Sequence, residues 1–394
     1  MTFVAAPLFY SKEKSMAKSG KLSSKDLLKM LNKKAGKDIA FLGDDENPAD
    51  IRDWIPTGSD WLDAIICRGQ KAGIPVGRIT EIAGLESSGK SFMAGQVAAA
   101  AQKKGIRVIY YDSEQTMTSE FLEKLGCDMD GENAIVIVQP EDVEMVLETI
   151  ETCLTEDPDT RYLHILDSLA MTPCRADLEK DFNPQSSIAQ KPRVLSVGMQ
   201  KLTVGLNKTQ STFLVLNQLK TNINPSNPMM QLSQPYSTPG GKAIIYAYSL
   251  RIWLTGLKGK STFVEDENGY RVGSEVKVKL EKSKFGTQGR ICNFKILWAG
   301  DRIGIMNEES LLTAIKKSDK ISVSGAWYQM EGYDKKFQAS KFAELLNTDE
   351  SFSKIVHDII DEEVIRKFEN KTGKASDFYD TEEEVVGDQQ DPDC

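Results

Sequence analysis

A segment rich in glycine and serine constrains this chain of 394 residues more than any other feature. It fits the phosphate-loop pattern GxxxxGK[ST] with Gly84, Leu85, Glu86, Ser87, Ser88, Gly89, Lys90 and Ser91. In such a loop, backbone N–H groups at a helix N-terminus point at a phosphate, and the glycines permit its close approach. Lys90 would reach the β- and γ-phosphates, and the Ser91 hydroxyl would ligate Mg²⁺. The alternative is a structural turn, but an apolar run before the segment and a helical pattern after it favour an ATP site.

The segments around this loop alternate between short apolar runs and helical patterns. This alternation predicts strands joined by crossover helices, and therefore an α/β fold with a mostly parallel sheet. The runs expected as strands of this sheet are 78–83, 107–111, 134–138, 162–166 and 212–216. A helix is expected over 91–104, ending at Gly105. Three later runs are expected as antiparallel additions, because only short turns separate the last two of them: 249–254, 275–280 and 291–298.

Composition divides the chain into four regions. Residues 1–50 form a basic arm with an amphipathic helix that begins at Ser24 and ends before Gly36. Residues 51–298 form the ATPase core, and residues 299–372 are expected to form a small C-terminal α/β domain. Residues 373–394 carry eight acids and no base after Lys374, so this tail is expected to be disordered.

Two carboxylates end predicted strands and are candidates for the chemistry. Asp167 follows the run 162–166, at the carboxyl edge where open α/β sheets bind ligands, and would hold Mg²⁺ together with Ser91. Glu114 follows the run 107–111 and is the candidate base that activates the attacking water. Two alternatives stay open for this second strand end: Asp112 could be the base, or Glu114 could be an ordinary helix-capping acid.

A third strand end leads into a long loop. Gln218 closes the run 212–216 and precedes residues 219–242, which are rich in Asn, Pro, Ser and Gly. Loops of this length are usually functional or disordered. An amide at the base of the loop could sense the γ-phosphate and order the loop.

The charge distribution points to a polyanionic partner. The net charge of the whole chain is −9, but residues 182–264 contain no Asp or Glu and carry nine Lys and Arg residues. Buried strands that lack acids are the alternative explanation. We interpret the window as a surface for nucleic-acid phosphates.

At this point the residues resemble bacterial RecA and its phage-encoded relatives. The segments that carry the resemblance run in order over roughly residues 25–365: GRITEI at 77–82 with the phosphate loop, DSE at 112–114, KLGCD at 124–128, LDS at 166–168, NQ at 217–218, GG at 240–241 and GAWY at 325–328. The resemblance implies a RecA-like core and a helical filament of identical subunits, with ATP bound between neighbours.

The resemblance also implies further site residues. Thr118 and Phe121 match positions beside the adenine, where the family usually has Asp and Tyr. Lys282 and Lys284 match two lysines that reach the γ-phosphate across the subunit interface, as an arginine finger does. Two DNA-binding loops follow at about 172–187 and at 219–242. Their matched residues are Ile188, Arg193, Lys220, Gly240, Gly241 and Lys242, the last in place of an Asn.

The function expected from these features is ATP-dependent pairing and strand exchange between single-stranded and double-stranded DNA, in recombination and repair. The N-terminal helix resembles the segment that docks on the next protomer, and the acidic tail resembles one that moderates access to duplex DNA. A single-strand-binding protein and a loader are expected as partners. The alternatives are a non-catalytic regulator on the same core and a hexameric helicase. The chain has no stretch of eighteen apolar residues, so we expect a cytoplasmic protein without a membrane partner.

Overall fold

The computed structural model describes residues 22–36, 40–42, 47, 49–178, 190–222, 235–257, 259–300 and 302–366. The chain divides into two compact units, Met1–Asp50 and Ile51–Cys394. In the first unit, helix α1 (Ser24–Ala35) has Ser23 as its N-cap, whose hydroxyl accepts from Asp26 N, and Gly36 closes it at φ 65°. The bounds agree with those expected from the sequence. The cap lies one residue earlier than Ser24, because its side chain must sit outside the helix to accept from the first turn.

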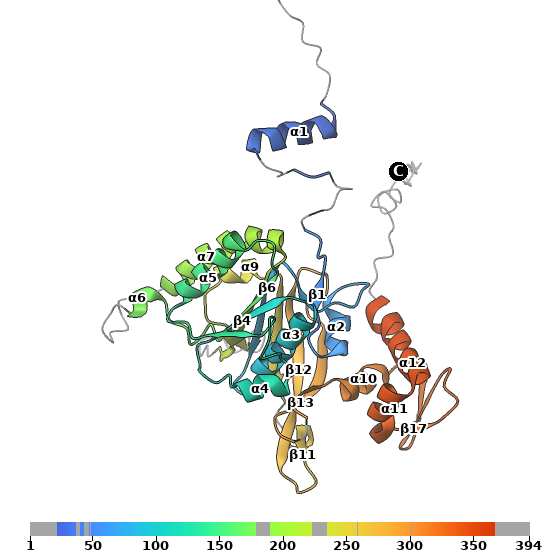
Figure 1. The fold of residues 1–394 in the computed structure, drawn as a ribbon. Coiled ribbons are helices and arrows are strands. Elements are labelled where there is room, and N and C mark those ends of the chain that lie inside the picture. Colours follow the sequence, from blue (N-terminus) through green and yellow to red (C-terminus); the bar gives the residue numbers. More distant parts are fainter. Residues whose placement is uncertain are drawn as a thin grey trace, which may run out of the picture. The chain divides into compact units, whose positions relative to one another are not determined.

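The second unit is built on a sheet in which ten strands pair among the described residues (Figure 1). Its parallel strands, in spatial order, are β10 (Leu250–Gly256), β3 (Ile79–Gly84), β7 (Thr212–Gln218), β6 (Tyr162–Asp167), β4 (Arg107–Asp112) and β5 (Val136–Val138). The antiparallel additions are β12 (Arg271–Ser283), which pairs with β10, then β13 (Ile291–Leu297) and β14 (Gly304–Met306), with β11 (Phe263–Glu265) folded onto β12. The predicted α/β class with a mostly parallel sheet is therefore confirmed.

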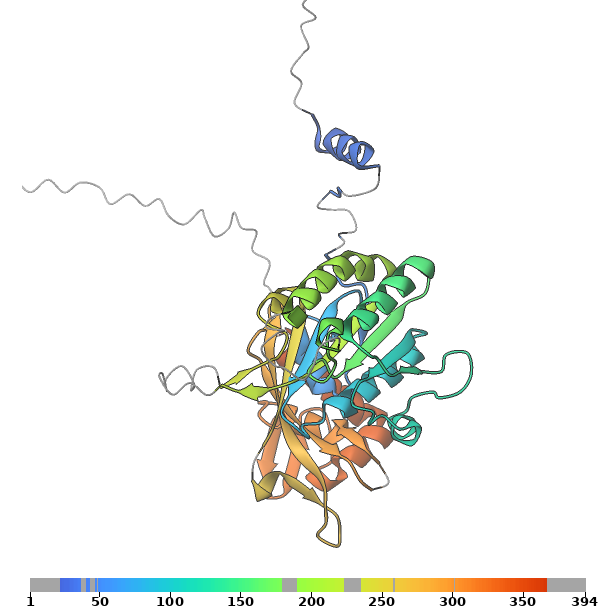
Figure 2. The ribbon, with the colours of Figure 1, turned by 90° about the vertical axis from the view of Figure 1, so that its left-hand side faces the viewer.

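Helices cover both faces of this sheet, and the pleat of the strands assigns side chains to them. Leu214 and Leu216 belong to the core cluster that packs on α3 (Lys90–Lys103), whereas Phe213 and Val215 belong to the cluster that packs on α5 and α7. Among the described residues of this unit up to residue 300, the helices are α2 (Asp60–Ile66), α3, α4 (Ser119–Lys124), α5 (Val143–Glu156), α6 (Arg175–Leu178), α7 (Gln190–Thr209) and α9 (Ala243–Ala247). Figure 2 shows α5 and α7 side by side. Strands buried on both faces read as continuous apolar runs for this reason.

The residues after 302 pack around a separate hydrophobic core. After α10 (Asn307–Ile315) come β15 (Ile321–Ser324), β16 (Trp327–Met330), β17 (Phe337–Gln338), η3 (Ala339–Lys341), α11 (Phe342–Thr348), α12 (Glu350–Ile360) and a π-helical turn η4 (Asp361–Ile365). Phe352 lies at its centre, with ring centroids 4.9 Å from Phe337 and 5.4 Å from Phe342. Aromatic rings fill much of the volume of this small core.

Short elements modify the expected pattern at several points. Strands β1 (Trp54–Ile55) and β2 (Ile74–Pro75) form a separate pair, and η2 (Lys260–Thr262) precedes β11. The segment 219–242, expected to lack structure of its own, contains the paired strands β8 (Lys220–Thr221) and β9 (Tyr236–Ser237). Strand β12 spans 13 residues and so exceeds the expected run 275–280, since its outer part pairs with β11.

Some expectations concern residues outside the described part of the chain. These are the tail 373–394, most of the first DNA-binding loop with Ile188, and residues 223–234 of the second. Among the residues that are described, no helix has the length and apolar character needed to cross a membrane.

Candidate nucleotide-binding site

A cavity of about 1040 Å³ lies at the carboxyl edge of the parallel strands. One wall is the phosphate loop, residues 85–91, together with Phe92. Glu114, Asp167 and Gln218 also line this cavity, each from the end of a different strand or from the residues just beyond it. The fold thus brings together four predicted parts of the site that lie up to 133 residues apart in the sequence.

The phosphate loop connects β3 directly to α3. Gly84 ends the strand, and a Cβ atom there would overlap the Ser88 hydroxyl. Gly89 is the N-cap of α3 with φ 88°, a left-handed conformation that side chains disfavour. The first N–H groups of α3 therefore open toward the cavity next to a residue that has no side chain to cap them.

Lys90 is the cation of the loop. Its Nζ atom donates to the carbonyl oxygens of Leu85 at 3.0 Å and Gly84 at 3.4 Å. Burial lowers the pKa of Lys90, and the carboxylates of Asp167 and Glu114 oppose that shift. The ammonium is thus held against the backbone of the loop, in a place where an added phosphate would strengthen the charged form.

Ser91 and Asp167 form the oxygen pair expected to hold a metal ion. Ser91 Oγ donates to Asp167 Oδ2 at 2.9 Å, and the hydroxyl of Tyr110 donates to the same oxygen at 2.8 Å. Asp167 is only 3% exposed. Burial raises its pKa, with the two hydroxyl donors opposing and Glu114 adding to the rise. Hydroxyl and carboxylate oxygens are ligands that suit Mg²⁺, and a cation there would reverse the cost of burying Asp167, so this pair fits the ion.

The geometry separates Glu114 from its rival Asp112. Glu114 is exposed and lines the cavity, and its Oε1 accepts from Ser168 Oγ at 2.6 Å. Asp112 is 3% exposed, and its Oδ2 accepts from Met117 N at 2.9 Å. Helix α4 is capped by Thr118, so Glu114 is not its N-cap. These contacts favour Glu114 as the group that could meet a water molecule in the cavity.

The two residues matched to the adenine lie near the cavity but do not line it, as far as the described residues define it. Thr118 Oγ1 accepts from Phe121 N as the cap of α4. The ring of Phe121 packs edge-on against Phe92 with centroids 4.9 Å apart, and Phe92 lines the cavity.

Aromatic side chains that were not predicted from the sequence line part of the same cavity. The Arg271 guanidinium lies 3.8 Å from the ring centroid of Phe263 and 5.1 Å from that of Trp298. All three residues line the cavity, from β11, β12 and the end of β13. A flat, apolar base could stack on such a surface. Trp298 directly follows the alternating strand β13, which is a weak signal that only the fold makes meaningful.

The structure places Lys282 and Lys284 away from this cavity. They lie at the end of β12 that pairs with Leu250 and Arg251, whereas Leu254 pairs with Gly84 at the phosphate loop. Lys282 Nζ donates to Ile245 O at 2.5 Å. Burial lowers the pKa of Lys282, and the neighbouring Lys284 lowers it further.

The stems of the two predicted DNA-binding loops lie beside each other. Lys220 is exposed on β8, and Gly240 and Gly241 follow β9 with φ 105° and 83°. A Cβ atom on Gly241 would lie 3.0 Å from Pro192 at the start of α7, so the returning end of the second loop lies against the helix that follows the first. Lys242 is exposed at the N-cap position of α9, without a side-chain cap hydrogen bond.

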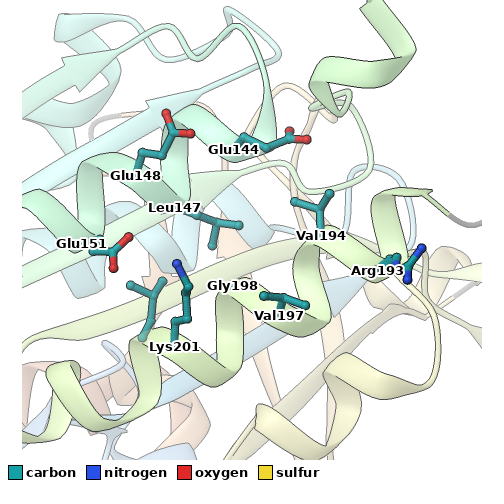
Figure 3. A pocket seen from close by; sticks show the side chains of 10 residues that line it. Glu144, Leu147, Glu148, Glu151, Arg193, Val194, Val197, Gly198 and Lys201 are labelled. Carbon is teal, nitrogen blue, oxygen red and sulfur yellow. The ribbon is translucent and has the colours of Figure 1, made fainter.

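Arg193 is exposed in the first turn of α7 and lines a second cavity of about 380 Å³ between α5 and α7. Figure 3 shows the opposite wall of this groove, which carries Glu144, Glu148 and Glu151. The groove as a whole is thus not positive. A phosphate contact by Arg193 would have to come from its loop side.

Comparison with known proteins gives the family of this arrangement. The family model described as the RecA N-terminal domain matches residues 23–303. The chain is 31% identical over 363 residues to Protein RecA of Campylobacter lari, covering 92% of this chain and 96% of the relative. It is 32% identical to Protein RecA of Clavibacter michiganensis, over 77% of this chain and 78% of that protein.

The chain belongs to the RecA family. Membership assigns it to a family of DNA recombination and repair proteins that bind nucleotide, and confirms the resemblance drawn from the sequence. The RecA family match covers the phosphate loop, the strand ends of the cavity and the stems of both loops. The roles of the individual side chains remain predictions.

Proposed function

We propose that this chain is an ATP-dependent recombinase that polymerises on single-stranded DNA as a helical filament and catalyses homologous pairing and strand exchange with duplex DNA. One observation supports the proposal above the others. A phosphate loop, a Ser91–Asp167 oxygen pair, the Glu114 carboxylate and the Gln218 amide meet in one cavity, and β7 leads from that cavity into a basic loop.

The cavity residues divide the work of ATP hydrolysis. The N–H groups of the loop and of α3, with Lys90, would hold the β- and γ-phosphates. Ser91 and Asp167 would hold Mg²⁺, which offsets the negative charge of the phosphates when bound. Glu114 would orient the attacking water and accept its proton. The Ser168 hydroxyl that donates to Glu114 fixes the direction of that carboxylate.

Two further groups would connect hydrolysis to the filament. Gln218 stands between the cavity and β8, where an amide can contact a γ-phosphate and report its presence to the second loop. Lys282 and Lys284 lie away from their own cavity, so we propose that they complete the site of a neighbouring subunit.

Thr118 and Phe121 would flank the adenine, with Phe121 acting through its packing on Phe92.

The DNA contacts proposed for the two loops are Ile188 and Arg193 in the first, and Lys220, Gly240, Gly241 and Lys242 in the second. Backbone N–H groups at the glycines and the lysine side chains would bind phosphates without reading sequence. We further propose that the arm 1–50 docks on the next protomer and that the acidic tail 373–394 moderates access to duplex DNA. A single-strand-binding protein and a loader would assist in the cytoplasm.

ATP hydrolysis measured with and without a single-stranded oligonucleotide tests the proposal most directly. We expect hydrolysis to rise with the oligonucleotide and strand exchange to require ATP. Electron microscopy of the same samples should show helical polymers. Closed rings would favour a helicase, and hydrolysis that ignores DNA in the absence of any polymer would contradict the proposal.

A further inference from the structure

A buried ion pair crosses the sheet close to the phosphate loop. Glu81 on β3 is fully buried, and its cross-strand neighbour Arg251 on β10 is 5% exposed. Arg251 Nε donates to Glu81 Oε2 at 2.6 Å. Burial raises the pKa of Glu81, whereas Arg251 and Asn217 oppose the rise. A buried ion pair adds little net stability compared with apolar residues of similar size, so stability alone does not account for it.

The remaining hydrogen bonds of this pair lead to the second loop. Asn217 Nδ2 donates to Glu81 Oε1 at 3.0 Å and also to Pro239 O at 3.0 Å. Arg251 Nη2 donates to Thr238 Oγ1 at 2.9 Å. Thr238 and Pro239 form the leg by which the chain returns from the loop, directly before Gly240. The ion pair therefore fixes the returning leg.

The outgoing leg is attached to the same strand. Leu219 N donates to Gly84 O at 2.9 Å, where β3 becomes the phosphate loop. Its neighbour Gln218 lines the nucleotide cavity. In the returning leg, the ring of Tyr236 packs edge-on against Trp253 of β10, with centroids 6.4 Å apart. The outgoing leg thus starts at the nucleotide cavity, and the returning leg is held by hydrogen bonds from Asn217 and Arg251.

We propose that Glu81 is a positioning residue that, through Arg251 and Asn217, holds Thr238 and Pro239 at a fixed place relative to the phosphate loop. With the returning leg fixed, a shift of Gln218 on nucleotide binding must change the shape of the loop. With that leg released, the loop would absorb the shift. This coupling role rests on the proposed function, because it requires that the loop binds DNA and that Gln218 responds to nucleotide.

The mildest test removes one contact and leaves the ion pair in place. Thr238→Val deletes the hydroxyl that accepts from Arg251 and keeps the volume of the side chain. Thr80→Val is a matched control on β3, since Thr80 is fully buried and its hydroxyl has no hydrogen-bond partner within the described part of the chain. Thr238→Ser restores the hydroxyl. The quantity to measure is the ratio of single-stranded DNA affinities with a non-hydrolysable ATP analogue and with ADP.

We expect Thr238→Val to reduce this ratio by about fivefold, the size of one net hydrogen bond. The KM for ATP and the hydrolysis without DNA should stay at wild-type values, and Thr80→Val and Thr238→Ser should keep the wild-type ratio. A role confined to stability would lower the melting temperature and leave the ratio unchanged.

A second variant removes the pair altogether. Glu81→Leu combined with Arg251→Met replaces both charges by apolar side chains, which proteins tolerate better than loss of one partner. We expect this double variant to bind ATP while its two DNA affinities become nearly equal. Wild-type ratios in both Thr238→Val and the double variant would overturn the inference and leave the proposed function standing. A wild-type protein whose DNA affinity ignores nucleotide would overturn both.

Discussion

Lysine side chains lie near both ends of β10, but their electrostatic surroundings differ. Near Leu254, Lys90 faces carboxylates, and its ammonium is bonded to the carbonyl oxygens of its own loop. Near Leu250, burial lowers the pKa of Lys282, and the neighbouring cations Lys284 and Arg251 lower it further, where carboxylates oppose the corresponding shift of Lys90. At the first end, carboxylates of the same chain balance the charge of Lys90. The second end gathers positive charge that an anion from outside would stabilise, so one chain can contribute to two sites.

The largest effect is expected from the cation of the first end. Lys90→Ala should lower ATP hydrolysis by about a thousandfold, because a charge aimed at the phosphates in a low-dielectric site is lost. Steady-state hydrolysis and strand exchange measure this. Lys103→Ala is the matched control, since Lys103 is exposed in the last turn of the same helix and should leave both rates unchanged. Undiminished exchange by Lys90→Ala would remove the phosphate loop from the mechanism.

The carboxylate in the same cavity should rank next. Glu114→Gln keeps the shape of the side chain but removes the base, so kcat should fall by about a hundredfold or more while ATP still binds. Single-turnover hydrolysis together with nucleotide binding separates these two quantities. Asp112→Asn should have the smaller effect on kcat, because that buried carboxylate accepts from Met117 N. The reverse order of the two variants would make Asp112 the base.

A mixing experiment tests the second end. Lys282→Ala with Lys284→Ala should abolish DNA-stimulated hydrolysis but leave nucleotide binding by isolated subunits nearly intact. If these lysines serve a neighbour, mixing this variant with Lys90→Ala restores complete sites at about a quarter of the interfaces in an equal mixture. Recovered hydrolysis in the mixture is the measurement. A mixture as inactive as its parts would place the lysines in their own cavity or outside the mechanism.

The smallest effect is expected from His164, a polar residue that lies near neither end of β10. His164 is fully buried on β6, Tyr111 contacts its Nδ1 at 3.1 Å, and burial lowers its pKa to about 3. Below about pH 6.5 the unfolded chain takes up a proton on His164 and the folded chain does not, so the contribution of His164 to stability is constant above that pH and falls below it. The loss should reach about 2 kcal/mol by pH 5.

Denaturant unfolding at several pH values measures this slope. His164→Gln should remove this contribution, so that between about pH 6.5 and 4 the slope of the variant differs from that of the wild type. His357→Gln, at the exposed histidine of α12, should not. An unchanged slope in His164→Gln would show that other groups cause the loss of stability in acid.

Features formed by neighbouring residues could be predicted from the sequence, whereas features that join distant segments could not. The strand that ends in Asp167, the phosphate loop and helix α3 are local patterns, and the structure has them within one or two residues of the expected bounds. The ten-stranded sheet could be anticipated as a class, but its order could not, because apolar runs do not encode their neighbours. The two-residue strands β8 and β9 are too short to carry a pattern.

The candidate site shows the same division. Lys90, Ser91 and Asp167 could be named from motif and strand end, and the structure brings them together. Phe263, Arg271 and Trp298 could not, because their stacking arises from the folding of β11 onto β12 beside the end of β13. The alternation of these strands marks which side chains face inward, without saying what they face.

By itself, the sequence determined a phosphate-binding loop between a strand and a helix, a parallel sheet with carboxylates at its carboxyl edge, and a basic segment free of acids, since each depends on residues adjacent in the chain. Only the tertiary structure decided that Glu114 rather than Asp112 lines the cavity, that Phe263 and Trp298 line it too, and that Glu81 meets Arg251, 170 residues away. Hydrogen bonds and packing act over a few ångströms in space whatever the separation along the chain.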